Sequence, residues 1–149
     1  MFDELDKYKI KDHFFLKPTD RLSQVCNAPD SSKGMFISGV YVVYALAKGK
    51  IDLVYIGRSG EKGSDGEMKN RKAGCGGLRD RIINGKDSDK VARRTSWPAL
   101  IKLEGIEALD IYWYVTFDGI NKDFPEDVER FLLQQYINLY GQLPRWNRR

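Results

Sequence analysis

The sequence predicts an α+β domain in which a small, mainly antiparallel three-stranded sheet is flanked by helices. Three runs rich in β-branched and aromatic residues predict the strands: MFISGVYVVYAL from Met35, IDLVYIG from Ile51 and DIYWYVTFD from Asp110. Stretches with helical character lie before and after the third run, so the expected order is strand, strand, one or two helices, strand, helix.

The first two strands are joined by AKGK, a turn by composition, so we expect them to form an antiparallel hairpin. In the third strand successive side chains point to opposite faces of the sheet. One face then carries Ile111, Trp113, Val115 and Phe117, and the other carries Tyr112, Tyr114 and Thr116.

Three helices are expected in the second half of the chain. GLRDRIING is a short helix stopped by Asn84-Gly85, and SDKVARRTSWPALIKLEG is a longer one stopped by Gly105. FPEDVERFLLQQYINLYG has Pro125 in its first turn and ends at Gly141. Residues at helical spacing predict its core face: Val128, Phe131, Leu132, Gln135, Tyr136 and Leu139.

Residues 1–34 are expected to be an N-terminal extension, with a short helix begun by Thr19 or Asp20, and residues 35–149 the main domain. Between the second strand and the short helix GLRDRIING, GRSGEKGSDGEMKNRKAGCGG is a long, glycine-rich and cationic loop. Long loops inside compact domains are often functional.

Composition limits the classes of protein. With 42% hydrophobic and 31% charged residues, the chain is expected to be soluble and globular. No apolar run approaches the ~20 residues that cross a bilayer, and the charged N-terminus does not suit a secretory signal. The two cysteines, far apart in sequence, suit a reducing cytoplasm. The single histidine, His13, argues against a histidine-based zinc centre or a Ser-His-Asp triad, and is expected to be a surface or packing residue.

The net charge of +4 is a modest excess, concentrated in residues 62–81, 86–94 and the last five positions. Such basic regions suggest a polyanionic partner such as nucleic acid. An ordinary solvated surface explains the charge equally well when charge is the only observation.

Tyr41 and Tyr55 lie on the two paired strands, each two residues from a glycine, Gly39 or Gly57. A phenol can donate or accept a hydrogen bond or, when deprotonated, remove a proton. The default interpretation is a pair of half-buried aromatic residues, whose cross-strand contact is worth ~0.5–1 kcal/mol.

Later segments favour a catalytic role for the two tyrosines over simple packing. Five motifs occur in a fixed order over about residues 36–147. They are Gly39-Val40-Tyr41, Tyr55-Ile56-Gly57, Gly77-Leu78-Arg79-Asp80-Arg81-Ile82, Val128-Glu129-Arg130-Phe131-Leu132-Leu133 and Leu143-Pro144-Arg145-Trp146-Asn147. This ordered set resembles the GIY-YIG nuclease superfamily, and the resemblance implies a GIY-YIG-like fold.

The resemblance implies metal-dependent hydrolysis of DNA phosphodiester bonds. Tyr41 would be the general base or position the water, and Tyr55 would orient the phosphate or the water. Arg81 would stabilise charge on the phosphate, and Glu129 would bind Mg²⁺ or Mn²⁺. Asn147 would be the asparagine of the closing segment.

Alternatives remain open for these residues. The segment before Leu78 is longer than in compact members of the family, so Arg71 or Arg79 could replace Arg81. The histidine that many members carry after the arginine is missing, and Asn84 and Lys86 occupy that region. Without the resemblance, Arg81 is expected to be a solvated helix residue and Asn147 a turn residue. For Glu129, a role in stabilising the N-terminal half of its helix is as well supported as metal binding.

Six cations are expected to contact the phosphates of DNA without reading its sequence: Arg58, Lys62, Arg79, Lys86, Arg93 and Arg94. Arg58 could instead lower the pKa of a nearby tyrosine. A symmetric double-strand cut would need two active sites, hence a homodimer or sequential nicking. The alternatives to a DNA endonuclease are a non-catalytic nucleic-acid-binding module on the same scaffold and a small interaction domain.

Overall fold

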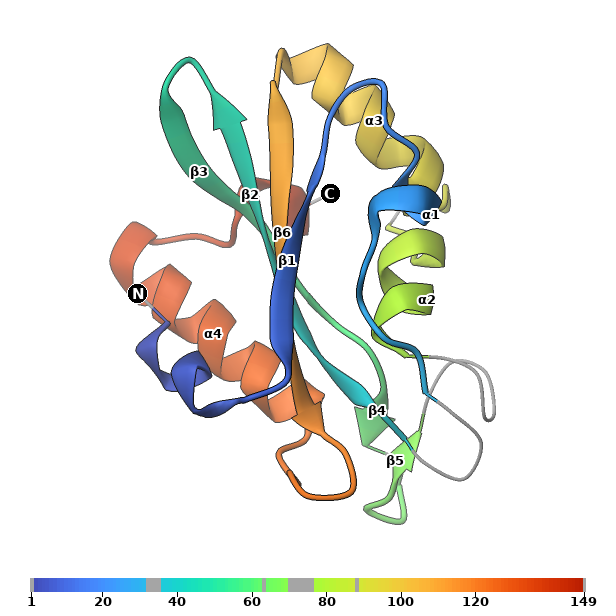
Figure 1. Ribbon diagram of the computed structural model, residues 1–149. Helices are drawn as coiled ribbons and strands as arrows, with labels where there is room; N and C mark the ends of the chain where they lie inside the picture. The colour runs from blue at the N-terminus through green and yellow to red at the C-terminus, as the bar shows by residue number, and fades with distance from the viewer. Residues whose placement is uncertain (1, 32–35, 63, 70–76, 88, 149) are drawn as a thin grey trace.

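The computed structural model describes residues 2–31, 36–62, 64–69, 77–87 and 89–148. A four-stranded antiparallel sheet with strand order β1-β6-β2-β3 lies between two layers of helices (Figure 1). The elements in chain order are η1 (Asp3–Lys7), β1 (Lys11–Leu16), α1 (Leu22–Val25), β2 (Ser38–Ala47), β3 (Lys50–Arg58), β4 (Glu61–Lys62), β5 (Met68–Lys69), α2 (Leu78–Asn84), α3 (Arg93–Glu104), β6 (Ala108–Phe117), α4 (Pro125–Tyr140) and η2 (Arg145–Arg148).

The α+β class and the strand–strand–helix–strand–helix order are confirmed, but the expected count of three strands in the main sheet is wrong. The fourth strand is β1, which pairs with β6 from Lys11 opposite Tyr114 to Leu16 opposite Leu109. Its sequence, KDHFFL, has polar residues at the start and an exposed Phe15, as an edge strand permits, so its apolar pattern is short. The N-terminal segment therefore adds a strand to the sheet of the main domain.

Each face of the sheet has its own core. Helices α1, α2 and α3 cover one face, while α4 and η1 cover the other (Figure 1). Ile111, Trp113 and Val115 point into the first core, as the alternation in the third predicted strand indicates. The second core is smaller and is made by Leu5, Tyr8, Val40, Val42, Leu53, Ile56 and Leu132.

The predicted core face of α4 is only partly correct. Leu132 is buried, and Val128, Leu133 and Tyr136 pack around it, but Phe131 and Leu139 are 52% and 63% exposed. A stripe of residues four apart, Val128, Leu132 and Tyr136, faces the sheet. Phe131 lies about 100° around the helix from Leu132 and faces solvent. Leu139 falls within the angular range of the stripe but is exposed in the last turn of the helix.

Helices α3 and α4 end where the sequence predicts. Gly105 and Gly141 follow them with φ of +68° and +79°, a left-handed conformation that glycine adopts without strain. In the described ranges, no helix has the length and apolar character needed to cross a bilayer.

The N-terminal segment is tied to the loop before α4 by one charge-assisted hydrogen bond. The hydroxyl of Tyr8 donates to the Asp123 carboxylate at 2.7 Å, and Lys7 lies 3.1 Å from the same carboxylate oxygen. The bond from Tyr8, aided by Lys7, lowers the pKa of Asp123 below its ordinary value of 3.8. The ionised Asp123 carboxylate therefore stabilises the fold above pH 3.8, and this stabilisation is lost as the pH falls through the lowered pKa of Asp123.

Replacing Tyr8 with Phe should reduce the free energy of unfolding by about 1 kcal/mol at pH 7, because the carboxylate loses its donor. Urea titrations at pH 7 and at pH 2 to 3 check this, and the difference between wild type and Tyr8→Phe should shrink at the lower pH. Tyr140→Phe, at an exposed tyrosine of α4, serves as the control. An equal loss at both pH values would contradict the assignment of the effect to Asp123.

Candidate active site

The guanidinium of Arg93 joins the two tyrosines of the hairpin. Arg93 is the first residue of α3 and is 0% exposed. Its Nη1 donates a hydrogen bond to the hydroxyl of Tyr41, and its Nη2 donates to the hydroxyl of Tyr55 at 2.6 Å. The two phenol rings lie 6.0 Å apart between centroids, so one buried cation fixes the position of both hydroxyls.

Two glycines make room for this arrangement. A Cβ on Gly57 would lie 2.5 Å from the Tyr41 hydroxyl oxygen and 2.7 Å from a ring carbon of Tyr55. A Cβ on Gly85 would lie 2.9 Å from the Cζ of Arg93. Real Cβ atoms do not approach so closely, so both positions exclude a larger residue unless the site shifts.

The buried charge of Arg93 is balanced within the same cluster. Its Nη1 also donates to the carbonyl of Arg81 at 3.0 Å, and its Nη2 lies 3.3 Å from the Asp87 carboxylate. Burial lowers the pKa of Arg93, but the two phenols and Asp87 raise it by more, so the guanidinium stays charged. A paired and hydrogen-bonded buried charge is stable where an isolated one is not.

This placement corrects the expectation that Arg93 contacts DNA phosphates, because a fully buried side chain is not available to a duplex. The spacing of apolar residues along α3 could have shown that Arg93 is buried. Arg93, Trp97, Leu100 and Ile101 stand at positions i, i+4, i+7 and i+8, and all four are buried. Arg93 therefore lies on the core face of its helix.

The two tyrosines differ in their access to water. Tyr41 is 0% exposed, which corrects the expectation that its phenol activates or positions a water molecule. Tyr55 is half-buried and lies toward the edge of the sheet on β3. Burial raises the pKa of Tyr55 by more than Arg93 and Arg81 lower it, so this hydroxyl is protonated at neutral pH.

Glu129 lies beside the end of β3. Its carboxylate accepts a hydrogen bond from Nη1 of Arg58 at 2.9 Å, and the two side chains are 17% and 26% exposed. They open into a hollow of ≈ 320 Å³ that also has Glu126 and Arg130 in its lining. The carboxylate is therefore not sealed in the core, but it lies on the α4 side of the sheet, opposite the side on which Tyr41 and Tyr55 pack.

Arg81 connects the carboxylate and the phenol electrostatically. Burial raises the pKa of both Glu129 and Tyr55, and the positive charge of Arg81 lowers both. One guanidinium that acts on both groups lies near both of them. Tyr55 and Arg81 lie on the side of the sheet that α2 covers, and Glu129 lies on the side that α4 covers. No hydrogen bond or ion pair among the described residues joins the three side chains, and the hollow beside Glu129 is lined by neither Tyr55 nor Arg81.

The side-chain amide of Asn147 is hydrogen-bonded to the backbone of β3. Its side chain accepts a hydrogen bond from the backbone N–H of Ile56 at 2.9 Å and donates to the carbonyl of Ile56 at 2.9 Å. The amide thus pairs with the edge strand as a neighbouring strand would. Asn147 holds the segment between Tyr55 and Gly57 in place and is a positioning residue.

The remaining expected cations lie in several places. Arg79 donates to the carbonyl of Ser23 at 2.6 Å, on the side of α1, which favours Arg81 over Arg79 as the arginine of the site. Lys86 and Arg94 are exposed, and Arg94 donates to Asn84. Arg71 and the side chain of Lys62 lie outside the described residues.

The site offers few ligands for a metal ion. Among the described residues, no group of three or more His, Cys, Asp or Glu side chains could hold one. Mg²⁺ nevertheless often binds through one or two carboxylates together with water and substrate phosphate. Glu129 and Glu126, three residues apart in the lining of the hollow, fit that donor set.

Comparisons with known proteins return no match: no family model, no curated protein and no solved structure is similar to this chain. The resemblance of the motifs to the GIY-YIG superfamily therefore stays a prediction. The geometry described above supplies the argument for function.

Replacing Arg93 with Met should lower the free energy of unfolding by about 3 kcal/mol, because two phenols and Asp87 lose the cation that pairs with them. Equilibrium urea denaturation checks this. Arg94→Met, at the exposed neighbour, is the matched control and should change stability by less than about 0.5 kcal/mol. Equal, small effects of the two substitutions would show that the buried guanidinium is not needed for the fold.

Proposed function

We propose that this protein is a cytoplasmic, metal-dependent endonuclease that hydrolyses phosphodiester bonds of DNA. The observation that carries the proposal is that the charge of Arg81, from α2, acts on both Tyr55 of the edge strand β3 and Glu129 of α4, on the other face of the sheet. Phosphodiester hydrolysis needs an oriented water molecule, positive charge on the phosphate and help for the leaving oxygen. These three residues supply the groups for those tasks.

The arginines would hold the phosphate. Among the residues that the structure describes, only the backbone carbonyl of Arg81 joins the Tyr41–Tyr55–Arg93 cluster. Its guanidinium would then make a bidentate contact with phosphoryl oxygens. Arg58 would contribute a second guanidinium, although its Nη1 is paired with Glu129. Within the described part of the chain its buried Nε has no hydrogen-bond partner, and it lies beside Glu129. A phosphate oxygen would satisfy that buried donor only after the Arg58–Glu129 pair opens.

Tyr55 would position the attacking water. Its hydroxyl oxygen accepts from Arg93, so its own proton points elsewhere and is available to a water or to a phosphate oxygen. Because burial keeps its pKa above the ordinary value of 10, orienting the water fits this phenol better than removing a proton from it. The water oxygen bonds to phosphorus while the bond to the leaving sugar oxygen breaks.

A divalent cation, Mg²⁺ or Mn²⁺, would be held through Glu129 with Glu126 beside it, and would polarise the phosphate and stabilise the leaving oxygen. In the structure Arg58 forms an ion pair with the Glu129 carboxylate, so binding of a divalent cation has to weaken that ion pair. The same ion pair favours the alternative, a DNA-binding module without catalysis. A gel shift without magnesium-dependent cleavage would select that alternative.

DNA would be held by exposed cations around the site, with Lys86 and Arg94 on one side. If roughly six cations contact duplex phosphates, the logarithm of affinity should fall against the logarithm of salt concentration with a slope of about −5. A double-strand cut would also require two copies of the site, supplied by a homodimer or by two successive nicks.

Glu129→Gln and Arg81→Gln should each reduce nicking of supercoiled plasmid by at least about 100-fold, because each removes a charge that acts on the phosphate or its cation. The assay is run with Mg²⁺, with Mn²⁺ and with a chelator. Glu107→Gln and Lys102→Gln, both at exposed positions away from the site, are the controls. Full activity of either site variant would argue against the assignment.

A further inference from the structure

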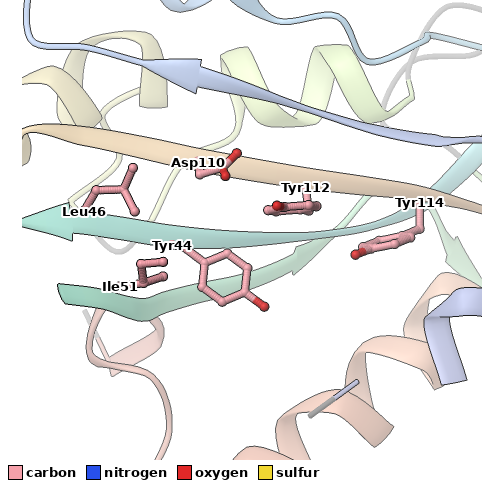
Figure 2. A pocket seen from close by; sticks show the side chains of 6 residues that line it. All are labelled: Tyr44, Leu46, Ile51, Asp110, Tyr112 and Tyr114. Atoms are coloured by element: carbon pink, nitrogen blue, oxygen red, sulfur yellow. The ribbon is translucent and has the colours of Figure 1, made fainter. Parts of the chain in front are cut away.

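One part of the sheet is not used by the candidate active site. On the face that α4 and η1 cover, Tyr44 and Tyr114 pack against the second core, and beyond them toward the β2–β3 turn Ile51 is 73% exposed. There the side chains of three neighbouring strands enclose a hollow of ≈ 180 Å³ (Figure 2). It is lined by Tyr44 and Leu46 from β2, Ile51 from β3, and Asp110, Tyr112 and Tyr114 from β6.

The aromatic rings of this hollow are held at fixed angles. The rings of Tyr44 and Tyr112 lie 5.6 Å apart with an interplanar angle of 84°, an edge-to-face contact (Figure 2). His13 of β1 stacks against Tyr112 at 4.7 Å and 13°, so it fixes that ring and covers one of its two faces. None of the cation–π contacts made by the described residues involves the rings of Tyr44, Tyr112 or Tyr114.

The hollow also has a negative charge at one end. Asp110 is 9% exposed and lines the hollow, with one carboxylate oxygen 2.7 Å from Nδ1 of His13. Burial is the main reason why the pKa of each of the three tyrosines is raised, and Asp110 raises all three further. For Tyr114, whose pKa is about 12, Asp6 adds to the effect.

We propose that this hollow binds a small organic cation through a quaternary ammonium group. The negative faces of perpendicular aromatic rings attract such a cation, and the Asp110 carboxylate adds a charge of opposite sign. A quaternary ammonium donates no hydrogen bond, so the apolar Leu46 and Ile51 suit it better than they suit a strongly hydrated lysine ammonium. The hollow is smaller than the ~300–1,000 Å³ of sites for drug-sized ligands, which favours a compact group.

Choline is the probe, and 3,3-dimethyl-1-butanol, which has the same shape without the charge, is the matched control. Titration of the full chain, followed by calorimetry and by NMR shifts of the tyrosine rings, should show saturable binding of choline. Choline should bind about 2- to 30-fold more tightly than the neutral alcohol, as cation–π energies of 0.5–2 kcal/mol require. Equal affinities, or no saturable choline binding, would overturn the proposal.

Substitutions locate the site. Tyr112→Leu should abolish saturation, Tyr112→Phe should retain it because the ring remains, and Asp110→Asn should reduce the preference for choline over the alcohol. Tyr140→Leu, at an exposed tyrosine of α4 outside the hollow, should have no effect. Binding that survives both Tyr112→Leu and Asp110→Asn would place choline elsewhere and overturn the assignment.

The proposal does not depend on nuclease activity, because the titrations contain neither DNA nor a divalent metal. A protein that binds choline but never cleaves DNA would support this site and refute the proposed function. Cleavage of DNA without choline binding would support the proposed function and refute the choline site.

Discussion

The hydrogen bonds of one buried guanidinium, Arg93, organise the part of the molecule that we assign to catalysis. They bring together the hairpin, through Tyr41 and Tyr55, and the end of α2, through the carbonyl of Arg81. A buried cation is costly unless every neighbour complements it, and here two phenols, a carbonyl and a carboxylate do so. This explains why glycine stands at Gly57 and Gly85, where any side chain would meet the cluster.

The sequence predicted those features that depend on local periodicity. The hairpin, the third predicted strand and the helix ends at Gly105 and Gly141 all follow from spacing and turn residues, and they are confirmed. The edge strand β1 was missed, since an exposed edge needs only a short apolar pattern. The exposure of Phe131 was missed because the width of a buried helix stripe depends on what packs against it.

Among the candidate site residues, the types were easier to predict than their roles. The order of the motifs led to Tyr55, Arg81 and Glu129, which the structure places on β3, α2 and α4, with α2 and α4 on opposite faces of the sheet. The sequence does not reveal which of two tyrosines is sealed, because that depends on α3 packing over Tyr41. Charge alone did not show that Arg93 is buried, at 0% exposed, and that its neighbour Arg94 is exposed. The helical spacing from Arg93 to Trp97, Leu100 and Ile101 does indicate that Arg93 lies on the buried face.

The central claim is that Tyr55, rather than Tyr41, is the phenol that acts in the reaction. The most direct test is the plasmid nicking rate of Tyr55→Phe and Tyr41→Phe, each corrected for its folded fraction. We predict that Tyr55→Phe loses at least about 100-fold in rate, on the scale of losing one aligned donor, whereas Tyr41→Phe keeps its rate and loses stability. A full rate for Tyr55→Phe together with an inactive, folded Tyr41→Phe would contradict the account.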